Sequence, residues 1–134
     1  MTSDEAEVLA ANRAFYRAFA RRDMAAMEAI WATRPGTSCI HPGRGAISRR
    51  DAVMQSWAAI LANPNAPAIV AHAEVAHVLG EVAYVTCHEV IEDTFLAATN
   101  VFVREGGAWK LVHHHAGPSV PPAGIAADTP KTLQ

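Results

Sequence analysis

The chain lacks several features that mark common classes of protein. It has only two cysteines, Cys39 and Cys87, among 134 residues, too few for a small domain stabilised by disulfides. It has no run of Lys or Arg, and its formal net charge is −2. This balance argues against nucleic acid or an anionic membrane as the main partner. No stretch approaches the roughly 18 uninterrupted apolar residues of a membrane span.

Targeting and cofactor motifs are also absent. The first ten residues carry acidic side chains, whereas a secretory signal begins with basic ones. We therefore expect a cytoplasmic protein whose two thiols are reduced and buried. The sequence has no Gly-x-Gly-x-x-Gly, Walker, Gly-x-Ser-x-Gly or Cys-x-x-Cys motif, so dinucleotide, nucleoside triphosphate and serine-esterase chemistry lack support. We predict that the protein needs no cofactor.

What is present fits one globular domain. Hydrophobic residue types make up 51% of the chain, and a domain of this length buries enough surface to be stable without staples or a structural metal. Four of the eight prolines lie beyond residue 117. We predict a folded domain over residues 1–117 and a Pro-rich extended or disordered tail over 118–134.

The amino-terminal half has helical periodicity. The first apolar stripe includes one polar residue and consists of Val8, Asn12, Phe15, Tyr16 and Phe19. Caps are expected at Ser3 or Asp4 for the first helix and at Asp23 for a short second one. A third helix is predicted from about residue 48 to residue 61.

From residue 68 onward the apolar period changes from 3.6 to 2. Residues 68–79, 82–92, 94–104 and 109–116 read as strands, and residues 37–41 as a shorter one. Tight connections at residues 80–81 and 106–107 predict antiparallel hairpins. The expected fold is α+β, with a strongly bent antiparallel sheet wrapped on three amino-terminal helices. Such a sheet leaves a hollow beneath the helices, and hollows of this kind commonly bind ligands.

Several segments resemble a known family. The stretches ARRDMAAMEAIW, CIHPG and GGAWKLVHHHAG resemble the SnoaL-like branch of the nuclear transport factor 2-like (NTF2-like) superfamily, over about residues 5–118. VLGEVAYVTC and TNVFVR are similar to the association (hub) domain of calcium/calmodulin-dependent protein kinase II. The resemblance implies a cone-shaped, cystatin-like fold and a homodimer formed through the outer side of the sheet. It does not imply a carboxylate ligand, because Val90, Asn100 and Ala116 stand where the hub domain carries cavity arginines.

Strand alternation predicts which side chains face the cavity. The expected set is Tyr84, Thr86, His88, Val90, Glu92, Asn100, Phe102, Val112, His114 and Ala116. Trp109, Leu111, His113 and His115 are then expected on the opposite side.

From these faces and the helical stripes we predict a ligand-binding pocket. Its residues are Tyr16, Trp57, His88, Asn100 and His114. If the protein is a catalyst, His88 or His114 carries the proton, and Tyr16 or Asn100 donates to a carbonyl oxygen. Each of these side chains is also compatible with a structural role in the interior, and for Tyr16 the sequence favours packing in the helical stripe.

The sequence also contains candidates for a carboxylate base and for metal ligands. Glu28 interrupts the second helical stripe and Glu92 shares the predicted cavity parity, so either is a candidate base. His113-His114-His115 and Cys39-Ile40-His41 place pairs of ligands on one face, but a complete zinc set is not evident. We predict no metal site.

The sequence thus predicts a small-molecule-binding SnoaL-like protein. Acid–base isomerisation, dehydration or cyclisation of a carbonyl compound is one function that fits. The alternative is a non-catalytic dimeric module for ligand binding or assembly, like the hub domain. The sequence leaves open whether the chain is an enzyme, and it names no substrate.

Overall fold

The computed structural model describes residues 1–124. The helices are α1 (Ser3–Arg21), α2 (Met24–Ile30) and α3 (Arg50–Ala62). The strands are β1 (Ser38–Ile40), β2 (Ala46–Ile47), β3 (Val70–Leu79), β4 (Val82–Ile91), β5 (Thr94–Glu105) and β6 (Ala108–Pro118). Residues 125–134, most of the predicted tail, lie outside the described residues. Along the described part of the chain, no helix combines the length and the apolar character needed to cross a membrane.

The helix boundaries follow from local capping. Thr2 caps α1 in a reciprocal capping box with Glu5, one residue before the predicted cap. The helix ends where Arg22 adopts a left-handed conformation. Asp23 then caps α2, as predicted, by accepting from the backbone N–H of Ala26 at 3.0 Å. This sharp reversal packs α2 against α1.

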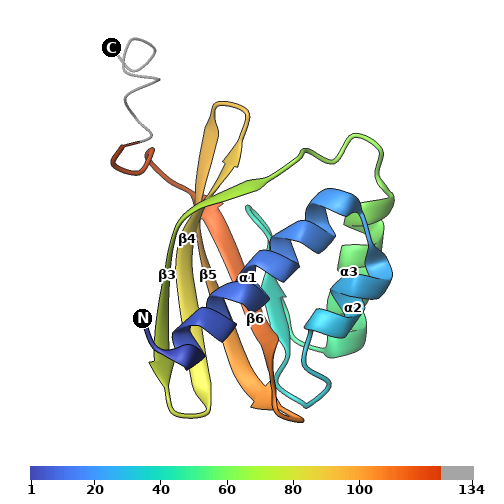
Figure 1. Cartoon of the computed structure of the whole chain (residues 1–134). Coiled ribbons are helices and arrows are strands. Elements are labelled where there is room, and N and C mark those ends of the chain that lie inside the picture. The colour runs from blue at the N-terminus through green and yellow to red at the C-terminus, as the bar shows by residue number, and fades with distance from the viewer. Residues whose placement is uncertain (125–134) are drawn as a thin grey trace.

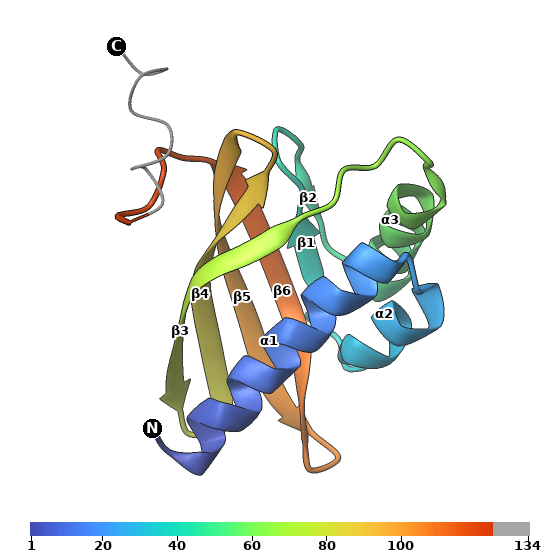
Figure 2. The same ribbon diagram turned by 45° about the horizontal axis from the view of Figure 1, so that its top comes forward.

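The six strands form one curved, open sheet in the order β2-β1-β6-β5-β4-β3. All neighbours are antiparallel except β1 and β6, which are parallel. The helices lie on one side of the sheet (Figures 1 and 2), with α1 crossing β3, β4 and β6. The predicted α+β architecture is confirmed, while the short strand β2 was not anticipated. We call the helix-covered side the inner face and the opposite side the outer face.

The predicted parity of β4 is wrong by one residue. Ala83, Val85 and Cys87 are buried on the inner face together with Glu89, whereas Thr86 is exposed on the outer face. The physical reason is packing: α1 places large aromatic side chains against this face, so small strand residues are needed beneath them.

The parity of β6 is split by an irregularity. Val101 pairs with His113 but Phe102 pairs with Leu111, so Val112 is an extra residue. The extra residue shifts the alternation of β6 by one, so Leu111 and His114, three residues apart, both face inward. Trp109 and Leu111 are therefore buried, contrary to prediction, while His114 and Ala116 are buried as expected.

Candidate functional site

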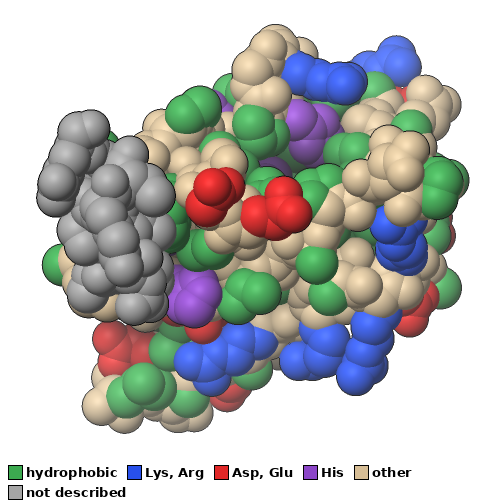
Figure 3. All heavy atoms as spheres, turned by 90° about the horizontal axis from the view of Figure 1, so that it is seen from above, with side chains coloured by type: hydrophobic (Ala, Val, Ile, Leu, Met, Phe, Trp, Pro, Cys, Tyr) green, Lys and Arg blue, Asp and Glu red, His purple; other side chains and the backbone are tan. Residues whose placement is uncertain are grey.

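A pocket of about 220 Å³ lies at one end of the sheet, between the inner face, α3 and the loop after β1. Its polar lining residues are Glu89, His114, His41 and Arg44, and the remaining lining residues are apolar. Seen from this end (Figure 3), histidine side chains lie in a hollow with basic side chains on one side and acidic ones on the other. The volume equals that of roughly seven water molecules in the liquid. This space suits a small organic compound.

Glu89 is the buried carboxyl group of the pocket. Its exposed fraction is 2%, and the Tyr16 hydroxyl donates to its Oε2 at 2.6 Å. Burial raises the pKa of Glu89, and the Tyr16 hydrogen bond opposes that rise only in part. A carboxyl group with a raised pKa beside a small pocket is suited to proton transfer.

Glu89 is not one of the carboxylates predicted from the sequence, and the two that are, Glu28 and Glu92, are both exposed. A usable signal exists in hindsight. Glu89 is the one acidic residue in an alternating set that otherwise consists of Ala83, Val85, Cys87 and Ile91. A single acid in such a set marks either a strand end or a buried functional group.

Asn100 joins the pocket to α1 through three buried hydrogen bonds. Its Nδ2 donates to Tyr16 Oη at 3.1 Å and to Asn12 Oδ1 at 2.8 Å. Its Oδ1 lies 2.5 Å from Nδ1 of His114. Asn12 and Asn100 are fully buried, so the polar residue of the first helical stripe meets a residue of the predicted pocket. An asparagine side chain has two N–H donors and two acceptor lone pairs. In Asn100 both donors and one lone pair are in use.

His114 is neutral in this environment. Burial, reinforced by the other imidazoles His41, His113 and His115, lowers the pKa of His114 to about 3. Its Nε2 lies 3.8 Å from Glu89 Oε2, beyond hydrogen-bonding distance. Because His114 is neutral and this distance is long, the two groups form neither a salt bridge nor a hydrogen bond with each other.

His41 and Trp57 complete the polar part of the pocket. His41 Nε2 is 3.0 Å from Ser56 Oγ, and because that hydroxyl donates to the Val53 carbonyl, the imidazole must be the donor. Burial lowers the pKa of His41. Trp57 packs edge-on against His41, with ring centroids 4.9 Å apart. The indole Nε1–H of Trp57 is buried and has no partner among the described residues.

Four of the five predicted pocket residues lie near one another, and two of these, Trp57 and His114, line the pocket. Tyr16, Asn100 and His114 belong to one hydrogen-bonded group, and Trp57 lies 5.8 Å from His114 between ring centroids. The fifth, His88, does not join them. It pairs with Ala97 on the outer face, so its predicted position in the cavity is corrected by the one-residue shift in β4.

The histidine-rich end of β6 is divided between the two faces. His113 contacts Ser38 Oγ at 2.7 Å, and its ring centroid is 6.4 Å from that of His115. Cys39 Sγ lies 3.6 Å from His41 Nε2, and burial raises the pKa of the Cys39 thiol to about 12. Over residues 1–124, no three His, Cys, Asp or Glu side chains are placed to hold a metal ion.

The neutral state of His114 predicts an acid-sensitive fold. Because its pKa is lowered from 6.5 to about 3, the unfolded chain binds a proton that the folded chain does not. The resulting stability is present above pH 6.5 and is lost as the pH falls toward 3. Between pH 7.5 and pH 5 this residue should account for a loss of about 2 kcal/mol in unfolding free energy.

Urea unfolding at the two pH values measures this loss. His114→Gln should show a loss about 2 kcal/mol smaller than wild type, whereas the exposed His77→Gln should match wild type. Equal losses in His114→Gln and wild type would contradict a neutral buried imidazole.

With the fold and the pocket defined, comparison with known proteins identifies the family. Residues 8–121 match the model of the SnoaL-like domain, and the chain belongs to this family. A candidate dehydratase of the NTF2-like family from Streptomyces avermitilis is 34% identical with a TM-score of 0.81, covering 89% of this chain and 98% of its own.

Hub-like proteins are also similar. A candidate calcium/calmodulin-dependent protein kinase type II association domain from Thiobacillus denitrificans is 31% identical with a TM-score of 0.67, covering 83% of this chain and 94% of its own. The CaMKII hub of S. rosetta shares the fold at 21% identity and a TM-score of 0.70, covering 89% of this chain and 99% of its own.

F-box protein SKIP8 of Arabidopsis thaliana is 28% identical over 112 residues, or 81% of this chain. The chain spans about half the length of this curated relative, 48%.

Proposed function

We propose that the protein binds a small carbonyl compound in the 220 Å³ pocket and moves a proton on it, with Glu89 as the proton carrier. The observation that carries this proposal is a buried carboxyl group that lines a small, mostly apolar pocket and has a raised pKa. A carboxylate whose pKa is raised is a stronger base than an ordinary one, which suits the removal of a proton from carbon. The candidate dehydratase among the similar structures is compatible with this class of reaction.

The chemical step needs only groups of this chain. Ionised Glu89 takes a proton from the carbon next to the carbonyl group and becomes a carboxylic acid, while the C–H electron pair forms the enolate. The guanidinium of Arg44, which lines the same pocket, supplies the N–H donors and the positive charge for the enolate oxygen. Protonated Glu89 then returns the proton to another carbon, which is isomerisation, or to a departing hydroxide, which releases water.

Tyr16 and Asn100 have a different role in this scheme from the one that the sequence suggested. The hydrogen of Tyr16 and both amide hydrogens of Asn100 are already donated within the protein. They hold Glu89 and His114 in place and do not donate to the ligand. His114 Nε2, with its free lone pair, accepts a hydrogen bond from a ligand hydroxyl.

Exchange of protons at carbon tests the proposal without knowledge of the natural substrate. Cyclohexanone and 4-hydroxy-2-butanone are incubated with the protein in D₂O, and loss of the signal of the protons next to the carbonyl group is followed by proton NMR. Wild type should accelerate exchange in at least one compound, and Glu89→Gln should not. Acceleration that survives in Glu89→Gln would overturn the assignment of the base.

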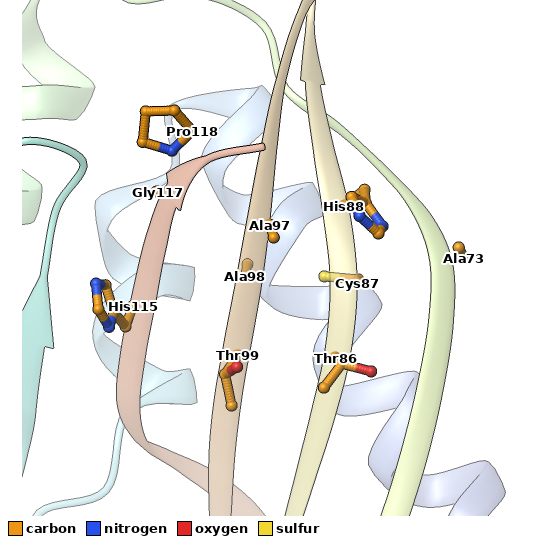
Figure 4. A pocket seen from close by; sticks show the side chains of 10 residues that line it. All are labelled: Ala73, Thr86, Cys87, His88, Ala97, Ala98, Thr99, His115, Gly117 and Pro118. Carbon is orange, nitrogen blue, oxygen red and sulfur yellow. The ribbon is translucent and has the colours of Figure 1, made fainter. Parts of the chain in front are cut away.

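We further propose that two copies of the chain pair through the outer face of the sheet, in the cytoplasm. A hollow of about 390 Å³ lies on this face; its lining includes Thr86, His88, Thr99 and His115 (Figure 4). No described helix covers these side chains. The association domain and hub among the similar structures support pairing, and the buried, unbridged cysteines fit a reducing compartment.

A single substitution tests the pairing. Thr99→Arg places a charge in the middle of the outer face, so we expect light scattering to give the mass of one chain, where wild type gives two. Ala25→Arg, on the exposed side of α2, is the control and should remain paired. A wild type with the mass of one chain would rule out the homodimer.

The hub-like relatives also favour a second candidate function, assembly without catalysis. Both candidates include pairing through the outer face, so they differ at the inner pocket. A purely structural module would tolerate Glu89→Gln and show no proton exchange in either form.

A further inference from the structure

An ion pair at the edge of the sheet is connected to the pocket by a continuous chain of hydrogen bonds. Arg13 Nε donates to Glu74 Oε1 at 3.1 Å, and Asn12 Nδ2 donates to Glu74 Oε2 at 2.7 Å. From Asn12 the chain continues to Asn100 and then to His114. It joins an exposed arginine on α1 to the imidazole beside Glu89.

Glu74 reaches this chain because β3 is irregular. The register of β3 against β4 shifts between His72 and Val75, and Ala73 has a φ of 56°. The extra residue turns Glu74 toward α1, where its side chain is only 13% exposed. A regular strand would not offer a carboxylate to Asn12 at this point.

We infer that Glu74, held by Arg13, determines which ring nitrogen of His114 carries hydrogen. A carboxylate only accepts hydrogen bonds, so Asn12 must turn its amide N–H₂ toward Glu74 and its Oδ1 toward Asn100. Asn100 must then donate to Asn12 Oδ1, which turns its own Oδ1 toward His114. His114 is left to donate from Nδ1, and its Nε2 keeps the lone pair that faces Glu89.

The opposite direction is excluded by two contacts. If both amides were reversed, Asn12 Oδ1 would face the Glu74 carboxylate at about the present separation of 2.7 Å, with no hydrogen between two acceptors. Asn100 would also stop donating to Tyr16, whose hydroxyl would be drawn away from Glu89. Glu74 and Glu89 therefore fix the direction from the two ends of the network.

Glu74, Asn12 and Asn100 are thus positioning residues, and Arg13 holds the first of them. Their effect is to make His114 a hydrogen-bond acceptor toward the pocket, which favours a carbonyl compound that also carries a hydroxyl group. This consequence for the ligand rests on the proposed function. The state of the imidazole does not, and it is measured on the protein alone.

The test is a two-bond ¹⁵N–¹H correlation spectrum of protein labelled at histidine, which distinguishes the two neutral forms of each imidazole. The His114→Gln spectrum assigns the His114 signals. Wild type and Glu89→Gln, in which Glu74 is the remaining carboxylate of the network, should both show His114 with hydrogen on Nδ1 alone. Glu74→Leu/Glu89→Gln should show the Nε2–H form at about a tenth of the population or more, because the contact between two acceptors that disfavours this form is gone.

The matched control is Glu81→Leu/Glu89→Gln, because Glu81 pairs with Arg104 on the surface and its side chain is 81% exposed. It should keep the Nδ1–H form. If Glu74→Leu/Glu89→Gln does not give a folded spectrum, Glu74→Gln/Glu89→Gln takes its place, since a glutamine presents either a donor or an acceptor to Asn12.

Two results would overturn the inference. One is a wild-type His114 with hydrogen on Nε2, or on both nitrogens, at neutral pH. The other is an unchanged Nδ1–H form in the folded Glu74 variants, which would mean that Glu74 does not set the direction. If the Glu74 effect is found but no carbonyl compound exchanges protons, the inference stands and the proposed function fails.

Discussion

Glu89→Gln is expected to lower the rate of proton exchange about 10²- to 10⁴-fold, the usual contribution of a general base. Glutamine keeps the length of the side chain and can still accept from Tyr16, so the pocket should keep its shape. The loss would then reflect the missing basic oxygen and no other change. The measurement is the exchange rate in D₂O at saturating cyclohexanone or 4-hydroxy-2-butanone, with Glu28→Gln, an exposed acid on α2, as the control.

The same substitution should increase stability at high pH. Burial raises the pKa of Glu89 in the folded protein, so the folded state holds a proton that the unfolded state has lost. The stability contributed by this group is present below its unfolded pKa and is lost as the pH rises through the folded pKa. Glu89→Gln removes that loss and should be more stable than wild type at pH 8 by roughly 1 kcal/mol, with a smaller difference at pH 5. The quantity to compare is the unfolding free energy of Glu89→Gln minus that of wild type. If this difference were smaller at pH 8 than at pH 5, the pKa of Glu89 would not be raised by folding.

Asn100→Leu is expected to be the most destabilising single change in the network, by about 4 kcal/mol. Leucine has a similar shape but offers no polar atom, so His114 Nδ1, Tyr16 Oη and Asn12 Oδ1 each lose a buried partner. Leaving a buried polar group unpaired costs about 1–3 kcal/mol, and three are affected at once.

Urea unfolding at pH 7.5 measures this effect. Gln55→Leu removes an exposed amide on α3 and should change the unfolding free energy by less than about 0.5 kcal/mol. An Asn100→Leu protein within about 1 kcal/mol of wild type would show that the hydrogen bonds of this network are replaced by others.

Much of the fold is predictable from the sequence because its signals are local. The capping role of Asp23 is set by the backbone around it, and the hairpins follow from short glycine-containing turns between alternating strands. The strand β2 is too short to show a period of two residues. It exists because β1 offers it a free edge, which is a tertiary effect.

The inward or outward direction of a strand is less predictable. Both alternating sets of β4 contain apolar and polar residues, so periodicity alone does not choose between His88 and Glu89. The choice depends on α1, which requires small side chains opposite its aromatic residues. In β6 the extra residue Val112 interrupts the alternation, and nothing in the local sequence marks that point.

The candidate site was predictable where a polar residue interrupts an apolar stripe. Asn12 interrupts the first helical stripe in this way, and in the structure it bonds to Asn100 of the predicted pocket. Glu74 did not stand out, because its inward direction depends on the irregularity in β3. Which polar residues meet across the interior is decided by packing, and no spacing in the sequence encodes it.

The titration of Glu89 itself tests the account most directly. The side-chain carboxyl carbons of glutamate are followed by ¹³C NMR from pH 3 to pH 9, and the signal missing from Glu89→Gln identifies the residue. The account predicts a midpoint above the ordinary glutamate value of 4.5. A midpoint at or below 4.5 would mean that Glu89 is a stably ionised structural group, and its proposed role as a proton carrier would be wrong.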